Sequence, residues 1–96
     1  MRPSLALQTH REAIRTIALS HRVTKVRVFG SVLTGDDTDD SDLDILVELT
    51  KQTALMDIAA IQYELKHVLG ISVDVLTPTA LPDTFRNQVI EQAQPV

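Results

Sequence analysis

The sequence predicts a small α+β fold, in which a mixed three-stranded sheet has helices packed on one face. Two observations predict it. Segments with helical and with strand periodicity follow one another in the order helix, strand, strand, helix, strand, helix. The helical segment between the second and third strands can join them as parallel neighbours through a right-handed crossover. The 96 residues suit one domain, residues 1–96, with a modest core.

The first predicted helix covers residues 4–19, where apolar residues such as Leu7 and Ile14 recur at helical spacing. Ser4 is expected to cap its N-terminus, because a serine hydroxyl can accept a hydrogen bond from a free amide of the first turn. The first predicted strand follows at residues 23–29, a run rich in β-branched residues.

A turn begins at Gly30 and Ser31 and continues as a short helical piece through Leu33. It leads into a polar loop, residues 36–41, whose aspartates are expected to be solvated, because aspartate favours turns. These aspartates are Asp36, Asp37, Asp39 and Asp40. The second predicted strand covers residues 42–49.

The second long helix is predicted over residues 54–69 and ends at Gly70. Its apolar stripe consists of Leu55, Ile58, Gln62, Leu65 and Leu69, widened by Ile61 and Val68. The third strand is predicted over residues 71–76, and a last helix over residues 82–93. Along the last helix Phe85, Val89 and Ala93 recur at a spacing of four, a stripe that suits either the core or a partner surface.

Composition excludes several classes of protein. Thirteen acidic residues against nine basic ones give a formal net charge of −4, which disfavours a general nucleic-acid binder. The absence of cysteine excludes disulfides, zinc thiolates and thiol nucleophiles. No apolar run approaches the ~20 residues that a membrane span needs, and the N-terminus lacks the apolar segment of a signal peptide. The expectation is a cytoplasmic protein without membrane contact.

Carboxylates occupy strand positions that aspartate normally avoids. Because successive strand residues point to opposite faces, Asp42 and Asp44 share one face and Leu43 and Ile45 the other. Two like charges one pleat apart raise a pKa or require a cation. Asp74 is a third aspartate inside an apolar strand, on the corresponding face. These departures from local preference indicate a metal site rather than a solvated surface.

Two other motifs are excluded because the chain lacks residues that they require. Gly30 and Gly35 have the spacing of a phosphate-binding P-loop, but Asp36 and Asp37 stand where lysine and serine or threonine are required. An EF-hand register over residues 37–48 places Asp42 where the loop needs glycine. Neither a P-loop nor an EF-hand is therefore predicted.

A strand, Gly30-Ser31, and then Asp42-Leu43-Asp44 after ten intervening residues resembles the nucleotidyltransferase superfamily that includes DNA polymerase beta. The separate Asp74 on a later strand also matches, and the resemblance covers nearly the whole chain. It implies the nucleotidyltransferase fold and transfer of a nucleotide from ATP. Many members of the superfamily carry arginine where Thr34 stands, so one expected phosphate contact has no counterpart here.

The resemblance also implies roles for individual residues. Asp42, Asp44 and Asp74 would hold two Mg²⁺ ions and form the catalytic group, with Asp74 able to accept the proton of the attacking hydroxyl. Gly30 would let the backbone approach the triphosphate, and Ser31 would donate its hydroxyl to a phosphate oxygen.

In length the chain is similar to the minimal nucleotidyltransferases, MntA-like antitoxins that pair with HEPN-domain toxins. That similarity implies a hetero-oligomer in which AMP passes from ATP to a hydroxyl of the toxin, that of a tyrosine, and silences it. Two alternatives stay open. One is a non-catalytic antitoxin that neutralises the toxin by binding alone, and the other is nucleotide transfer to a small molecule.

Overall fold

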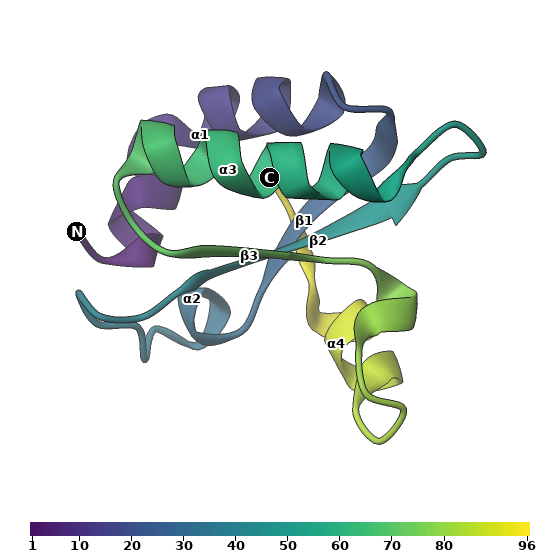
Figure 1. Cartoon of the computed structure of the whole chain (residues 1–96). Helices are drawn as coiled ribbons and strands as arrows, with labels where there is room; N and C mark the ends of the chain where they lie inside the picture. The colour runs from purple at the N-terminus through teal and green to yellow at the C-terminus, as the bar shows by residue number, and fades with distance from the viewer.

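Four strands form the sheet, one more than the sequence predicts (Figure 1). The computed structural model describes all residues, 1–96. In chain order the elements are α1 (Pro3–Leu19), β1 (Val23–Phe29), α2 (Ser31–Thr34), β2 (Leu43–Leu49), α3 (Leu55–Leu69), β3 (Val73–Leu76), the 3₁₀ helix η1 (Pro78–Ala80), α4 (Arg86–Gln92) and β4 (Gln94–Pro95). The predicted α+β class is confirmed.

The sheet has the order β3-β2-β1-β4 and is mixed. β1 pairs antiparallel with β2 and with β4, whereas β2 and β3 are parallel and joined through α3, as the sequence predicts. The additional strand β4 has two residues and includes a proline, so it carries no periodic signal from which it could be predicted.

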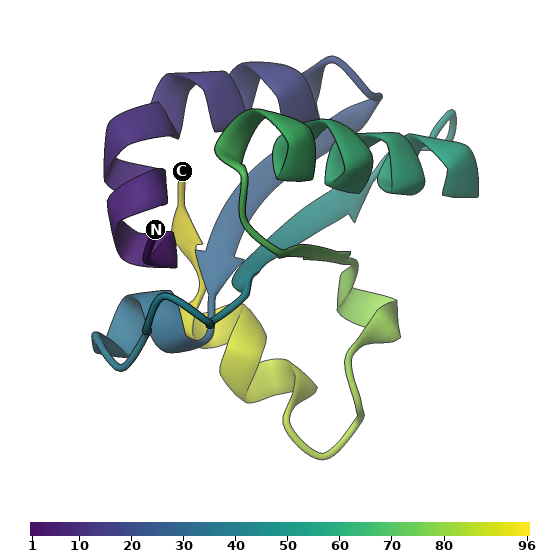
Figure 2. The same cartoon turned by 60° about the vertical axis from the view of Figure 1, so that its left-hand side comes forward.

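α1 and α3 lie side by side on one face of the sheet and cover it (Figures 1 and 2). The main core lies between these helices and the sheet and contains 15 buried residues. Leu43, Ile45 and Val47 of β2 point into it and are fully buried. This burial confirms the predicted alternation of the second strand, because the residues between them face the other way.

The stripe predicted for α3 is correct except at Leu55 and at Val68, which is 47% exposed. Ile61, Leu65 and Leu69 are buried against the sheet, but Leu55 is 85% exposed. The buried side chains define the centre of the stripe, and Leu55 falls to one side of it on the helix surface.

The opposite face of the sheet is partly covered by the segment that contains η1 and α4, which projects below the sheet in Figure 2. Leu46, Leu81 and Ala93 form a second, smaller buried cluster there, and Val89 packs against it. The apolar stripe of the last helix therefore belongs to the core at Val89 and Ala93. Phe85, the third member, remains 43% exposed.

α4 begins at Arg86, four residues later than predicted. The Arg86 guanidinium donates to the carbonyls of Pro78 and Leu81, each at 2.7 Å. These hydrogen bonds hold residues 82–85 in a non-helical turn, so the predicted start of the helix at residue 82 is wrong.

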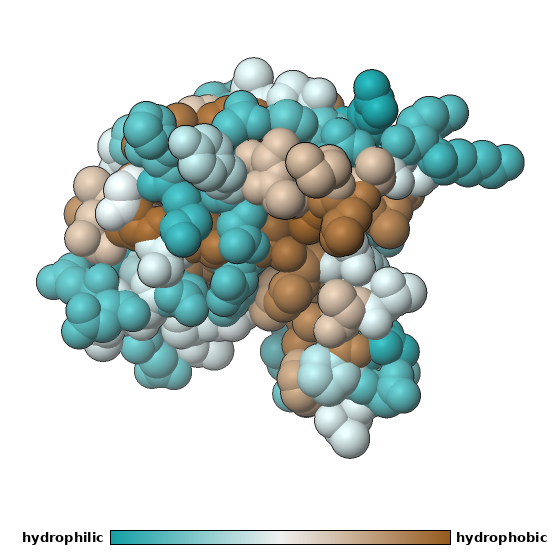
Figure 3. Space-filling model, viewed as in Figure 1, coloured by the Kyte–Doolittle hydropathy of each residue, from teal (hydrophilic) through white to brown (hydrophobic).

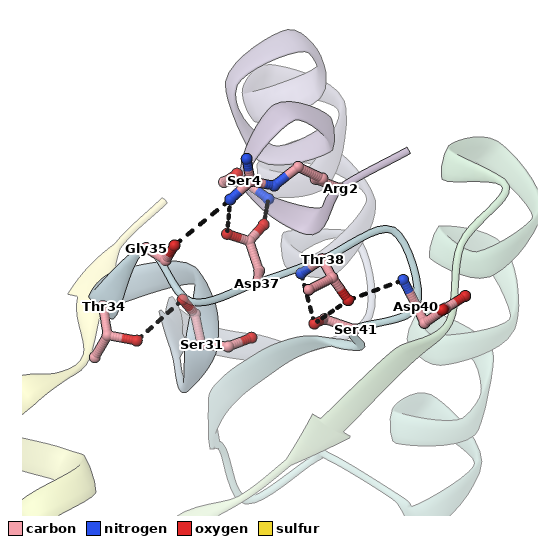
Figure 4. A network of polar contacts seen from close by, with 9 residues as sticks. All are labelled: Arg2, Ser4, Ser31, Thr34, Gly35, Asp37, Thr38, Asp40 and Ser41. Atoms are coloured by element: carbon pink, nitrogen blue, oxygen red, sulfur yellow. Dashed lines mark hydrogen bonds and ion pairs between the residues drawn. The ribbon is translucent and has the colours of Figure 1, made fainter.

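The N-terminus of α1 is capped by Asp37, and the predicted role of Ser4 as the cap is wrong. Pro3 starts the helix, and the Ser4 amide donates to the Asp37 carboxylate at 2.7 Å. Arg2 donates to the other carboxylate oxygen at 3.1 Å (Figure 4). Asp37 is only 3% exposed, so the prediction of a solvated side chain is wrong for this loop residue. The other loop aspartates, Asp36, Asp39 and Asp40, are exposed as expected.

Asp37 should contribute to stability through its charge. The hydrogen bond from the Ser4 amide, with help from Arg2, holds the pKa of Asp37 below its usual value despite its burial. A carboxyl group whose pKa is lowered by folding stabilises the protein above its unfolded pKa, and the contribution disappears as the pH falls through the folded pKa. We therefore expect Asp37→Asn to lower the melting temperature at pH 7 and to have no effect in strong acid. Asp36→Asn is the control, and equal melting temperatures of Asp37→Asn and the unmodified chain at pH 7 would contradict the expectation.

No helix of the chain has both the length and the apolar character that crossing a bilayer requires.

Candidate functional site

Asp44 and Asp74 are direct neighbours across the parallel strands β2 and β3. Paired residues of adjacent strands point to the same face, so both carboxylates stand on the face opposite α1 and α3. Asp42 was predicted to be the first residue of the second strand but lies immediately before β2, and its charge acts on both of the others. The fold thus brings together three aspartates that the sequence singles out.

The Gly30 turn lies against the Asp44 carboxylate. Phe29, the last residue of β1, is paired with Asp44, and the chain turns at Gly30 with φ of 81° and ψ of −148°. A Cβ atom at Gly30 would overlap an oxygen of the Asp44 carboxylate. Glycine is therefore required at this position for two reasons, the backbone conformation and the close approach of the carboxylate.

Ser31 is the first residue of α2 and is partly exposed. Its hydroxyl makes no hydrogen bond within the chain, so it is available to a ligand beside Gly30. The Thr34 hydroxyl, three residues later, donates to the carbonyl of Ser31 at 3.3 Å (Figure 4). Thr34 thus closes the short helix and supplies no positive charge to the turn.

The charges of the three aspartates are not neutralised by neighbouring cations. None of Asp42, Asp44 and Asp74 forms an ion pair with a lysine, arginine or histidine within the chain. Burial, followed by the charges of Asp74 and Asp42, raises the pKa of Asp44 to about 6. Burial and the neighbouring Asp42 also raise the pKa of Asp74, against a smaller opposing effect of Lys66.

The residues present fit a divalent cation by their donor type. Magnesium prefers carboxylate oxygens, and an unpaired cluster of negative charges gains most from a cation. The side chains are not closed around a common point, since no group of three or more acidic, histidine or cysteine side chains is arranged to hold an ion. The fit therefore rests on the chemistry of the donors and on the strand register that keeps Asp44 beside Asp74.

The raised pKa of Asp44 predicts an unusual pH dependence of stability without metal. A carboxyl group whose pKa is raised by folding binds its proton more tightly in the folded state, so its ionisation opposes folding. As the pH rises from 4 to above 6, we expect ionisation of Asp44 to lower the free energy of unfolding of the metal-free chain. The expected decrease is about 1–2 kcal/mol after allowing for solvent screening. Urea titrations in EDTA should show this loss in the unmodified chain and a smaller one in Asp44→Asn. Identical pH profiles for the two proteins would contradict the expectation.

Two hollows differ in their relation to this site. The larger, about 550 Å³, lies between α1, β1 and the C-terminal segment and contains none of the three aspartates. A smaller one, about 290 Å³, is bordered by Gly30 and lies between α2 and α4. The smaller hollow adjoins the cluster of unpaired carboxylates through Gly30, which lies against Asp44. The α4 wall of this hollow was not predicted, although the spacing of Phe85 and Val89 already indicated one face of that helix.

Comparison with known sequences identifies similar proteins over almost the full length. The model of the nucleotidyltransferase domain family matches residues 7–96. "Putative protein adenylyltransferase MJ0435" of Methanocaldococcus jannaschii is 36% identical over 77 residues, which are 80% of this chain and 83% of that protein. "Protein adenylyltransferase MntA" of Thermococcus cleftensis is 28% identical over 89 residues, with 84% and 90% of the two chains covered.

Solved structures give the same result. One described as a "putative minimal nucleotidyltransferase" has a TM-score of 0.85 at 36% identity and covers 97% of this chain and 95% of its own. A toxin–antitoxin structure with AMP-PNP has a TM-score of 0.73 at 20% identity and covers 88% of this chain and 69% of its own, which shows similarity of fold alone. The predicted nucleotidyltransferase fold is confirmed.

Proposed function

We propose, from the premise that the chain belongs to the nucleotidyltransferase domain family, that it is an antitoxin which transfers AMP from ATP to a hydroxyl of its toxin. The observation that carries this proposal is the pairing of Asp44 with Asp74 beside the Gly30 turn. Unpaired carboxylates next to a turn with a free hydroxyl are the parts that metal-assisted nucleotidyl transfer needs.

Each residue of the site has a role in this proposal. Asp42, Asp44 and Asp74 would hold two Mg²⁺ ions, which neutralise the triphosphate and lower the pKa of the attacking hydroxyl when bound. Gly30 lets the backbone lie close to the triphosphate, and Ser31 donates its free hydroxyl to a phosphate oxygen. Asp74, on the exposed side of the pair, accepts the proton of the incoming hydroxyl as the hydroxyl oxygen bonds to the α-phosphorus and pyrophosphate leaves.

Burial and the repulsion between neighbouring carboxylates raise the pKa values of Asp44 and Asp74 when no cation is bound, so binding of a cation is favoured here. Without a cation the three carboxylates should bind a triphosphate poorly, because phosphate and carboxylate repel each other. Most of the rate enhancement would then come from positioning and charge neutralisation.

The acceptor is proposed to be a tyrosine of a HEPN-type toxin. The similarity to proteins named as adenylyltransferases and to a toxin–antitoxin structure supports this assignment. No nucleic acid is expected to bind directly, since the chain is acidic overall. We further propose that the chain acts in the cytoplasm with this partner.

A transfer assay tests the proposal. The protein is incubated with ATP labelled at the α-phosphate, Mg²⁺ and the toxin encoded beside its gene. We expect label on the toxin together with loss of its toxicity, and neither with Asp42→Ala/Asp44→Ala. Asp36→Ala/Asp40→Ala is the matched control, because both of its aspartates are exposed and lie outside the site.

Two results would oppose the proposal. If Asp42→Ala/Asp44→Ala still neutralises the toxin without labelling it, the chain acts by binding alone. If label appears only on a small hydroxyl compound added in place of the toxin, the acceptor is a small molecule.

A further inference from the structure

The hollow between α2 and α4 has a lining that differs from the rest of the protein. It contains no charged side chain, although 23% of the residues in the chain are charged. Figure 3 shows a notch between the part of the molecule that contains α2 and the part that contains α4. Its walls include Gly30, Leu33 and Thr34 on one side and Phe85, Gln88 and Gln92 on the other.

α4 presents one face to this hollow. Gln88 and Gln92 are four residues apart on the same side of α4, and Phe85, the residue immediately before the helix, borders the same hollow. The adjacent side carries Val89 and Ala93, which pack in the cluster around Leu46 and fix the rotation of the helix. Neither glutamine side chain forms a hydrogen bond within the chain, and the Phe85 ring is 43% exposed. An aromatic surface and two unused carboxamides therefore face an uncharged space.

Gly30 connects this space to the acidic site. It forms part of the wall of the hollow, and its backbone lies against the Asp44 carboxylate. A ligand whose charged end is held at Gly30 and Asp44 can therefore place a neutral end between α2 and α4. The chemistry of the hollow suits a flat, uncharged ring with hydrogen-bonding edges, since aromatic side chains stack on such rings and carboxamides both donate and accept.

We propose that this hollow binds the nucleobase of the nucleotide, with Phe85 stacked on the base and the carboxamides of Gln88 and Gln92 bonded to its edge. This inference rests on the proposed function and adds the residues that select the base. A glutamine carboxamide pairs with N6 and N7 of adenine, whereas the same edge of guanine has two acceptors and is best bound by arginine or lysine. The uncharged lining thus favours adenine over guanine.

Binding measurements with three probes test this inference. ATP, GTP and tripolyphosphate are titrated separately into the chain in the presence of Mg²⁺, and heat release or melting temperature reports binding. Tripolyphosphate has no base, so it reports the acidic site alone. We expect ATP to bind more tightly than GTP by about tenfold, the discrimination typical of one good pair of hydrogen bonds to a base.

Variants of the α4 face separate the base from the phosphates. Gln88→Ala and Gln92→Ala should each weaken ATP binding by about threefold to tenfold, the range for one lost hydrogen bond. Phe85→Ala should weaken it by about fivefold or more, since stacking of a base on an aromatic ring contributes about 1–3 kcal/mol. Tripolyphosphate binding should not change. Asn87→Ala is the matched control, because Asn87 is an exposed carboxamide on the same helix that does not line the hollow.

The outcomes distinguish this inference from the proposed function. ATP binding that is lost in Asp44→Asn but unaffected in all three α4 variants overturns the base site and leaves the proposed function standing. Equal loss of ATP and tripolyphosphate in the α4 variants also overturns it, because the effect would then be structural. An unmodified chain that binds neither probe with Mg²⁺ overturns both proposals.

Discussion

Asp44→Asn is expected to lower the rate of AMP transfer by about a thousandfold or more, the largest effect of any single change. Asp44 is the central carboxylate of the site: it is paired with Asp74, acts together with Asp42, and contacts the Gly30 turn. In the proposed function Asp44 is a metal-binding carboxylate, so removing its charge would remove electrostatic stabilisation that commonly amounts to several kcal/mol. The measurement is the initial rate of labelling of the toxin at saturating ATP and Mg²⁺.

The same substitution should stabilise the protein in the absence of metal. Ionised Asp44 opposes folding, because burial and two neighbouring charges raise its pKa to about 6. The asparagine side chain is neutral, so the melting temperature of Asp44→Asn at pH 7 in EDTA should rise while the activity falls. Asp36→Asn, an exposed loop variant, should change neither quantity. An Asp44→Asn protein that is less stable than the unmodified chain, or one that retains more than about a tenth of the rate, would contradict the assignment of Asp44.

Gly30→Ala is expected to lower the transfer rate by about a hundredfold, because it displaces the Asp44 carboxylate. The new Cβ would overlap that carboxylate, and a misplacement of about 1 Å in a catalytic group can reduce the rate by this factor. The backbone at Gly30 also has a φ of 81° with a ψ of −148°, a combination that only glycine adopts without strain. Stability should therefore fall by about 1–3 kcal/mol, the usual cost of such backbone strain.

Comparison with Gly35→Ala separates the effect of backbone strain from the effect of overlap with the Asp44 carboxylate. Gly35 also has a positive φ, 78°, but a Cβ there would have no atom within 4 Å. We expect Gly35→Ala to lose stability and to keep its transfer rate at temperatures well below its melting point. Urea titration measures the stability, and the labelling assay, run well below the melting point, measures the transfer rate. Equal losses of activity in the two variants would show that strain alone, and not the contact with Asp44, explains the effect of Gly30→Ala.

The sequence predicted most elements because each has its own periodic pattern. The strand over residues 23–29 is found with the predicted bounds, and the helix over 54–69 differs by one residue at its start. β4 and the late start of α4 were not predictable in this way. A two-residue strand has no period, and the start of α4 depends on bonds from Arg86 to carbonyls of an earlier segment.

The loop over residues 36–41 shows where the preference of aspartate for solvated turns gives a wrong prediction. Aspartate is common in turns, so all four loop aspartates were expected to face water. Asp37 instead lies under the start of α1, more than thirty residues away, and binds the Ser4 amide and Arg2. Only the approach of the loop to the helix end distinguishes Asp37 from its neighbours, and nothing in the loop itself encodes that approach.

By itself the sequence determined that Asp42 and Asp44 share a face and that a glycine-serine turn precedes them, because neighbouring side chains of one segment are related by backbone geometry alone. Only the tertiary structure decided that Asp74 stands directly beside Asp44, that Asp37 is buried, and that α4 encloses an uncharged hollow next to Gly30. These relations join segments far apart in the chain, and their register is set by the packing of the whole core.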